Sequence, residues 1–283
     1  MSRRVLRLLV LAVSWMPLQL FGGDGVRVGA AAVNLKATDS MEIAGGIHPG
    51  AARGQEGELR AIAVVLEKEG VQLAIVMLDI LMITRDILDP AVREIENTTG
   101  IPSSHILINC THTHHAPSTM RVHGYGADLG FTMRVRKGIV EAVTRAHRGM
   151  SENESQFSFH LGREETVGQN SRQLLPDGSI YWIGRREFVR ATGPFDPELP
   201  VLAFRDHHSG GGEAGALRAV IFNHSTHTIG TMKPGVRSPS FYGLAGQRLE
   251  AELGGVFSFI EGASGSTHNS IGRISTRHIQ IVC

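Results

Sequence analysis

The chain has 283 residues, enough for one large domain or two small ones. Its 28 Lys and Arg residues balance 27 Asp and Glu residues, which excludes charge-driven disorder and provides no basic field for nucleic acid, so we expect no nucleic-acid partner. Two cysteines exclude a disulfide scaffold or a Cys-rich zinc module, whereas 14 histidines indicate that imidazole would hold any bound metal.

The N-terminal segment has the pattern of a targeting signal. Arg3 and Arg4 precede an apolar run from Val5 to Phe21, which is short for a membrane span and is interrupted by Arg7. We therefore expect a secretory signal peptide over residues 1–23, a domain over residues 24–283, and export of the protein to the periplasm or the medium.

The remaining sequence predicts alternating strands and helices. Hydrophobic periodicity and turn signals predict, in chain order, strands at 26–35, 59–67 and 71–81, a helix at 84–99, a strand at 105–111, a helix at 131–148, strands at 156–161, 179–183, 199–205 and 217–223, a helix at 241–253 and a strand at 256–261. The runs at 71–81 and 105–111 have the composition of buried strands, and residues 209–215 read as a surface loop. The fold class is therefore α/β, with mixed β-sheets of buried strands flanked by helices.

Histidines follow the predicted strand at 105–111. In an extended segment residues i and i+2 share a face, so His112 and His114 can reach one centre while Thr113 points away. Such a pair can provide two metal ligands, or one ligand and one acid/base group. The alternative is a polar loop whose histidines are solvated or hydrogen-bonded.

Two later strands also end in histidine-bearing loops. His224 and His227 follow the strand at 217–223, and His268 follows the strand at 256–261 in a loop that also contains Ser264 and Ser266. If the three strands lie side by side, their loops converge at the C-terminal ends of the strands, where α/β folds place their sites.

Other polar residues are candidates for supporting roles. Asp79 ends a buried strand, where its carboxylate needs a partner such as an imidazole N–H, or else caps the strand end. His115 and His224 lie beside the candidate ligands and are expected to support them. His123, in the loop at 123–126, could line the mouth of a pocket.

An ordered series of motifs resembles the catalytic N-terminal domain of the neutral/alkaline non-lysosomal ceramidases. The segments that carry the resemblance are 41–46 (MEIAGG), 60–66, the strand ending at Asp79, 111–117 (THTHHAP), 168–172 (GQNSR) before Asp177–Gly178, 196–202 (DPELPVL), 219–223 (AVIFN), His227 and the loop 262–269. The resemblance covers most of the chain after residue 24.

The resemblance implies a zinc amidase that cleaves the N-acyl bond of ceramide or a related amide, with possible peripheral contact to a membrane for access to its substrate. It implies that His112 and His227 bind Zn²⁺ and that His114 assists catalysis beside the metal. Asn170 and Arg172 correspond to the family's Asn-Arg segment, which holds the substrate or the oxyanion, although here Ser171 separates them.

The sequence also departs from the family. Ser266 replaces the Asp of a Gly-Asp stretch, and His268 stands where the family has a serine in the site. The family's remaining zinc ligands, a Glu and a Tyr, come later than this loop, whereas this sequence stops at Cys283. The domain is therefore expected to be incomplete at its C-terminus.

Two alternatives follow from these departures. The chain could be a catalytically incomplete or truncated member without enzymatic activity. It could also be a serine hydrolase that uses Ser266 or Ser264 with His268, although no G-x-S-x-G elbow is present.

Overall fold

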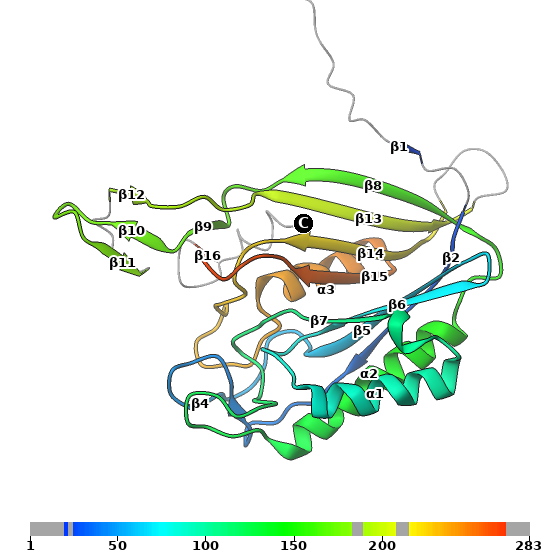
Figure 1. Cartoon of the computed structure of the whole chain (residues 1–283), viewed down its shortest axis with the longest axis horizontal. Coiled ribbons are helices and arrows are strands. Elements are labelled where there is room, and N and C mark those ends of the chain that lie inside the picture. Colours follow the sequence, from blue (N-terminus) through cyan, green and yellow to red (C-terminus); the bar gives the residue numbers. More distant parts are fainter. Residues whose placement is uncertain (1–19, 22–24, 183–188, 208–214, 270–283) are drawn as a thin grey trace, which may run out of the picture.

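The computed structural model describes residues 20–21, 25–182, 189–207 and 215–269. In them two β-sheets lie face to face, with α1 and α2 covering the outer face of one sheet (Figure 1). Of the expected signal peptide, only β1 (Leu20–Phe21) lies within the described residues. One end of the expected strand at 179–183 and most of the expected loop at 209–215 also lie outside them. No helix in the described part of the chain is both long and apolar enough to span a membrane.

The first sheet has four strands in the order β2 (Arg27–Asn34), β5 (Arg60–Lys68), β6 (Val71–Leu78) and β7 (Ile106–Cys110). Its neighbours are antiparallel except for β6 and β7, which α1 (Arg85–Thr99) and the short 3₁₀ turn Ser103–His105 connect in parallel. A hairpin turn joins β5 to β6, with Gly70 at a φ of 81°.

Both faces of this sheet are buried. On β5, Ala61 and Ala63 pack toward α1 and α2 (Leu129–Arg148), whereas Ile62 and Val64 pack toward the second sheet. The two-residue alternation of a strand produces these two sets, and burial on both sides explains why the strand reads as an unbroken apolar run.

The second sheet has the order β1, β8 (Ser155–Arg163), β13 (Glu198–Asp206), β14 (Leu217–His224) and β15 (Val256–Glu261). The strands β14 and β15 are parallel and are connected by α3 (Ser240–Leu253). Ala219 and Ile221 face the first sheet, whereas Val220 and Phe222 belong to the clusters on the other face of β14, which include residues of α3. The layers are therefore helix, sheet, sheet, helix, and the predicted α/β class is confirmed.

Two local features position α2, a cap at its first turn and a close contact with the first sheet. Asp128 accepts a hydrogen bond from the backbone N–H of Phe131 at 2.7 Å, which caps the helix and starts it two residues before the predicted position 131. At Gly29 a Cβ atom would lie 1.9 Å from the carbonyl oxygen of Ala146, so this close contact between β2 and α2 requires glycine.

Short strands surround these layers. They are β3 (Glu42–Ile43) with β4 (Gly50–Ala51), β9 (Gly168–Asn170) with β16 (Thr267–Asn269), and β10 (Arg172–Leu174) between β11 (Ile180–Trp182) and β12 (Arg190–Ala191). Of them only β11 falls within a predicted strand, the one at 179–183. The three strands β10, β11 and β12 form a small sheet, called the arm below, which projects beyond the two main sheets (Figure 1).

Three expectations about the strands were wrong. The run at 71–81 leaves the sheet after Leu78, and its first residues are exposed rather than buried. The strand at 105–111 is the edge strand β7, and Leu107 is 51% exposed because no strand lies beyond it. The three histidine-bearing strands are not side by side in one sheet, since β7 belongs to the first sheet and β14 and β15 to the second.

The contact between the sheets makes a test of the layered core. Phe204 on β13 is almost fully buried and packs against Phe157 with the ring centroids 5.5 Å apart. The change Phe204→Ala leaves a cavity between the sheets, so we expect a loss of about 3–5 kcal/mol in the free energy of unfolding, measured by urea denaturation.

The matched control is Leu129→Ala, at a side chain that is 77% exposed at the start of α2. We expect this change to alter stability by no more than about 0.5 kcal/mol. Equal losses in the two variants would contradict the assigned core.

Candidate metal centre

The candidate site lies where the four parallel strands of the two sheets end. The loops after β6, β7, β14 and β15 supply, respectively, the carbonyl of Leu81, the side chains of His112 and His114, the side chain of His227, and the carbonyl of Ser264. The expected convergence of histidine-bearing loops at strand C-terminal ends is therefore confirmed, although it occurs across two sheets.

Backbone carbonyls fix the protonation of the three imidazoles. The Nδ1 atom of His112 lies 2.9 Å from the carbonyl oxygen of Leu81, and that of His114 lies 2.7 Å from the carbonyl oxygen of Gly45. The Nδ1 atom of His227 lies 3.3 Å from the carbonyl oxygen of Ser264. Because a carbonyl oxygen can only accept, each Nδ1 is a donor, and each neutral ring therefore carries its free lone pair on Nε2.

The three Nε2 atoms face one another. The Nε2 atom of His227 lies 3.1 Å from that of His112 and 2.8 Å from that of His114. Three lone pairs at this spacing repel one another unless a cation lies among them. A tetrahedral zinc site with Zn–N bonds of about 2.0–2.1 Å separates its nitrogen ligands by about 3.3 Å, close to the arrangement found here. The three histidines could therefore hold a metal ion.

The electrostatic environment keeps these rings neutral. Burial, together with the charge of a neighbouring imidazole, lowers the pKa of His114 to about 3 and that of His227 to about 4. Burial also lowers the pKa of His112, against the hydrogen bond to Leu81. A neutral imidazole is the form that binds metals.

Local backbone structure presents the histidines. His112 has a φ of 58°, in the left-handed region, two residues after the end of β7, and His114 lies in the turn that follows. Thr113 points away and donates a hydrogen bond to the carbonyl of Ser238 at 2.8 Å. His112 and His114 therefore reach the same cluster with His227 as expected, but through a left-handed residue and a turn rather than through the alternation of an extended segment.

A cavity of about 480 Å³ opens beside the cluster. Arg172, Trp182 and His268 line it together with His114 and His227. The ring of His268 stacks on that of His227 with centroids 4.5 Å apart, and Trp182 contacts His268 edge-on at 5.7 Å. The Arg172 guanidinium donates to the hydroxyl of Ser171 at 2.8 Å and is the cationic group that lines this cavity.

The two serines of the last loop have different surroundings. Ser266 is exposed, and its carbonyl accepts a hydrogen bond from the backbone N–H of Ser171 at 2.7 Å. The hydroxyl of Ser264 donates to the carboxylate of Glu261. Among the hydrogen bonds of the described residues, none joins either serine hydroxyl to His268.

Two expected substrate-binding residues lie apart from the cavity lining. The Asn170 amide donates to the carbonyl of Pro194 at 2.9 Å and accepts from the backbone N–H of Arg172 at 3.0 Å, so it supports the segment that carries Arg172. His123 is exposed in its loop and is not among the residues lining the cavity.

The expected supporting histidines have different partners. His115 lines the cavity, and its Nε2 accepts a hydrogen bond from the backbone N–H of Gly230 at 2.8 Å. Burial lowers its pKa to about 4. His224 is fully buried on the opposite side of its strand end, between the carbonyl of Glu164 and the hydroxyl of Tyr242. It therefore contacts α3 rather than the metal-binding rings.

Asp79 occupies the strand-end position that was one of its two expected roles. Its carboxylate accepts hydrogen bonds from the backbone N–H of Arg60 at 2.9 Å and from the hydroxyl of Thr111 at 3.4 Å. These partners hold the end of β6 against β5 and against Thr111, the residue that follows β7 and precedes His112. Burial raises the pKa of Asp79 to about 7, although the nearby Arg60 charge opposes the shift.

Sequence reasoning missed the groups that orient the imidazoles, because all three are backbone carbonyls and carry no side-chain signal. Gly45 leaves one trace, since a Cβ atom there would lie 2.6 Å from His114 and its φ is 107°. Trp182 was also missed as a site residue, because its predicted strand at 179–183 carries no signal that places it beside the histidine-bearing loops.

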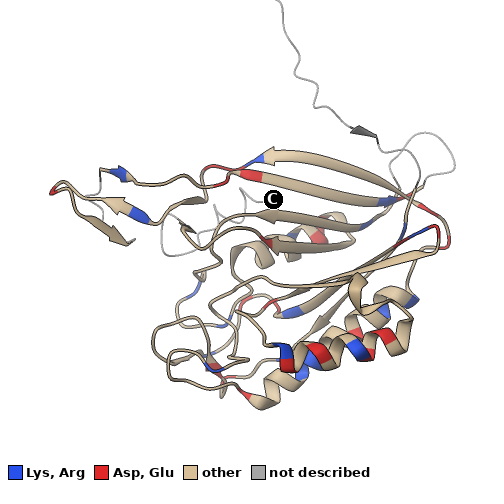
Figure 2. Cartoon of the chain, in the orientation of Figure 1, with Lys and Arg blue, Asp and Glu red and all other residues tan. Residues whose placement is uncertain are grey.

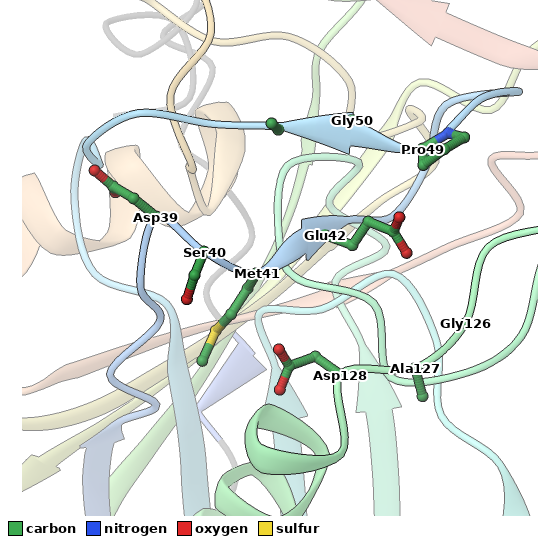
Figure 3. Close-up of a pocket in the computed structure, with 10 residues that line it drawn as sticks. Asp39, Ser40, Met41, Glu42, Pro49, Gly50, Gly126, Ala127 and Asp128 are labelled. Atoms are coloured by element: carbon green, nitrogen blue, oxygen red, sulfur yellow. The ribbon is translucent and has the colours of Figure 1, made fainter.

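A separate cavity of about 530 Å³ lies near β3, β4 and the start of α2 (Figure 3). Its lining includes Asp39, Glu42 and Asp128. Asp39 pairs with Arg237 at 2.7 Å and Asp128 caps α2, so two of these carboxylates already have structural partners. This cavity contains no imidazole cluster and is not the candidate site.

The ionisation of Asp79 gives a test of the strand-end network. The pKa of about 7 in the folded chain exceeds the 3.8 of a free aspartate. The stability contributed by the protonated carboxyl is therefore fully present below about pH 4 and is lost as the pH rises to about 7. The free energy of unfolding of the native chain therefore decreases between about pH 4 and pH 7. We expect this decrease to be smaller by up to about 4 kcal/mol in Asp79→Asn.

The measurement is urea unfolding of the native chain and the variant across this pH range. Glu261, whose pKa burial also raises to about 7, contributes a similar fall that the Asp79 variant retains. A variant with the native pH dependence would contradict the assignment.

Comparison with known proteins places this geometry in a known fold. No family model and no curated protein sequence matches the chain. Among solved structures, the neutral ceramidase from Pseudomonas aeruginosa matches with a TM-score of 0.69 and 20% identity over 87% of this chain, and a ceramidase complexed with C2 matches with a TM-score of 0.72 and 20% identity over 91%. The chain spans 40–42% of the length of these structures. At this identity the likeness shows the fold, and over the part it spans the chain has the fold of the ceramidases.

Proposed function

We propose that the protein is an exported, zinc-dependent hydrolase that cleaves the N-acyl amide bond of ceramide or a related lipid amide. The observation that carries the proposal is the meeting of three neutral imidazoles, each with Nδ1 committed to a backbone carbonyl and Nε2 directed at the other two. The likeness of the fold to the ceramidases supports the choice of substrate class.

The donor set fits Zn²⁺. Three imidazole nitrogens and no thiolate form a ligand set used in catalytic zinc sites, which keep a further position for water or substrate. When bound, Zn²⁺ lowers the pKa of water to about 7 and polarises a carbonyl. In this proposal His112, His114 and His227 all hold the ion. The expectation that His114 acts beside the metal, and not on it, is thereby revised.

The remaining cavity residues can serve the other needs of amide hydrolysis. The Arg172 guanidinium can donate hydrogen bonds to the oxygen of the amide, where negative charge develops as the carbonyl is attacked. His268 is half of a stacked pair with His227, and burial lowers its pKa, so the ring is neutral near pH 7. A neutral ring can accept a proton and return it to the leaving amine.

The cavity also suits a substrate with an apolar part. Trp182 and Ile229 line it beside the polar groups, and Gly45, Gly46 and Gly265 leave room around the cluster. An acyl chain can lie against the indole while its amide carbonyl reaches Arg172. We infer that the substrate is an amide with at least one apolar chain.

The serine hydrolase alternative has less support. Ser264 donates to the carboxylate of Glu261 and Ser266 is exposed, and among the described residues neither hydroxyl has the imidazole partner that this alternative requires. A fluorophosphonate reagent, which labels activated serines, is therefore expected to leave the protein unlabelled. Labelling that Ser266→Ala abolishes would contradict the metal-dependent mechanism.

Metal content is the direct test of the site. We expect the purified chain, after incubation with Zn²⁺ and dialysis, to retain one ion, measured by mass spectrometry of the metal. His112→Ala or His227→Ala removes a ligand and is expected to weaken binding by roughly a hundredfold or more. The matched control is His160→Ala, at an exposed histidine on β8.

Release of fatty acid from a short-chain N-acyl-sphingosine tests the reaction. We expect the zinc-loaded chain to release fatty acid and both ligand variants to lose this activity, while His160→Ala keeps it. A native chain that binds no zinc would contradict the metal site. A chain that binds zinc and releases no fatty acid would favour the catalytically incomplete alternative.

A further inference from the structure

The arm has two chemically different faces. In its register Arg172 lies opposite Trp182, and Leu174 lies opposite both Ile180 and Arg190. Residues opposite each other in antiparallel strands project to the same side. One face of the arm, called the Trp182 face below, therefore carries these five side chains, and the other carries Gln173 and its partners.

The Trp182 face exposes apolar groups to solvent. Ile180 is 62% exposed and Trp182 is 53% exposed. Ile180 and Trp182 are neighbours on one side of β11, in the small sheet that projects beyond the two main sheets (Figure 1). Adjoining exposed apolar groups of this kind mark contact surfaces rather than ordinary solvent-facing strands.

Basic groups flank these apolar side chains. Arg172 and Arg190 lie on the same face, in the strands on which Figure 2 shows basic residues. The described acidic residue of the arm, Asp177, lies in the turn between β10 and β11, where its carboxylate accepts hydrogen bonds from Ser179. The face thus combines an indole and aliphatic side chains with positive charge.

This combination matches the surface of an anionic bilayer. Indole rings favour the boundary between headgroups and hydrocarbon, aliphatic side chains enter the hydrocarbon, and arginines bind anionic headgroups. A dry protein interface fits this face less well, because it would desolvate two arginines that have no acidic partner among the described residues of the same face.

The face also continues into the candidate site. Trp182 and Arg172 belong to it and line the cavity beside His114, His227 and His268. A bilayer in contact with the arm would therefore lie at the mouth of the cavity, where a lipid amide could enter without crossing water.

We propose that the Trp182 face docks the protein on anionic membrane surfaces and delivers lipid substrate to the cavity. This inference rests on the proposed function for the identity of the delivered substrate, whereas the docking itself does not. The occupant is the lipid headgroup and upper acyl region, held by Ile180 and Trp182 through burial and by Arg190 through charge.

Co-sedimentation with vesicles tests the docking. The full chain is mixed with vesicles of phosphatidylcholine containing one third phosphatidylserine, and separately with vesicles of phosphatidylcholine alone. We expect binding to the anionic vesicles that weakens as salt is added, because part of the attraction is electrostatic. The double variant Ile180→Ser/Arg190→Glu is expected to lose at least roughly tenfold in affinity for these vesicles. Neither of its residues lines the cavity.

The control is Leu129→Ser/Arg93→Glu, which makes the same chemical changes at exposed positions on α2 and α1. We expect it to bind as the native chain does. Absence of native binding, or an equal loss in both double variants, would overturn the proposal. Sedimentation velocity without lipid completes the test, since a native dimer that Ile180→Ser/Arg190→Glu makes monomeric would show instead that the face joins two copies of the chain.

Activity on two forms of the substrate separates this proposal from the proposed function. With a soluble short-chain amide, Ile180→Ser/Arg190→Glu is expected to keep the native rate, whereas with long-chain ceramide in anionic vesicles its rate falls with its binding. Vesicle binding without hydrolysis of either substrate would leave docking intact and refute the proposed function. Hydrolysis of both at native rates by the variant would refute the docking.

Discussion

The site depends on three backbone carbonyls that accept hydrogen bonds from three imidazoles. Gly45, Leu81 and Ser264 supply them, and each removes from its histidine the choice between two neutral tautomers. Because the carbonyls belong to the backbone, their positions follow from how the two sheets pack rather than from side-chain rotamers. The three Nε2 atoms are thus oriented in advance by the backbone, so little reorganisation would accompany the binding of a metal ion.

The layered fold is what makes such a frame possible. Two parallel strand pairs, one in each sheet, end at the same place, so loops from both sheets meet without long excursions. The helices α1 and α2 cover the outer face of the first sheet and α3 covers β14 and β15 of the second, so the central strands can be apolar on both sides. The buried carboxylate of Asp79 joins β5, β6 and the end of β7 directly behind the cluster. The arm adds an exposed surface at the open side of the cavity.

Periodicity identified the long central elements, because strands buried on both faces and helices with an apolar stripe leave strong patterns, as β5 and α2 do. It also identified the imidazoles, since histidines after buried strands are visible in the sequence. Which strands share a sheet left no such trace, and β7 was therefore taken for an interior strand. Of the arm, the sequence predicted β11 within the strand at 179–183 but not β10 and β12, because strands of two or three residues carry no period, and nothing indicated that the indole of Trp182 lines the cavity.

The imidazoles and the carbonyls that orient them come from positions between 45 and 264, so long-range packing must bring together segments from nearly the whole described chain. The cluster consequently exists in the native state and not in the unfolded ensemble. Any ligand that binds it is coupled to folding: at a hundred times its dissociation constant it adds about 2.7 kcal/mol to the native state. Such a ligand would link the two sheets in addition to the apolar cluster between them and the hydrogen bond from the backbone N–H of Glu261 on β15 to Asn109 on β7. The thermal midpoint of the domain would then depend on the concentration of that ligand.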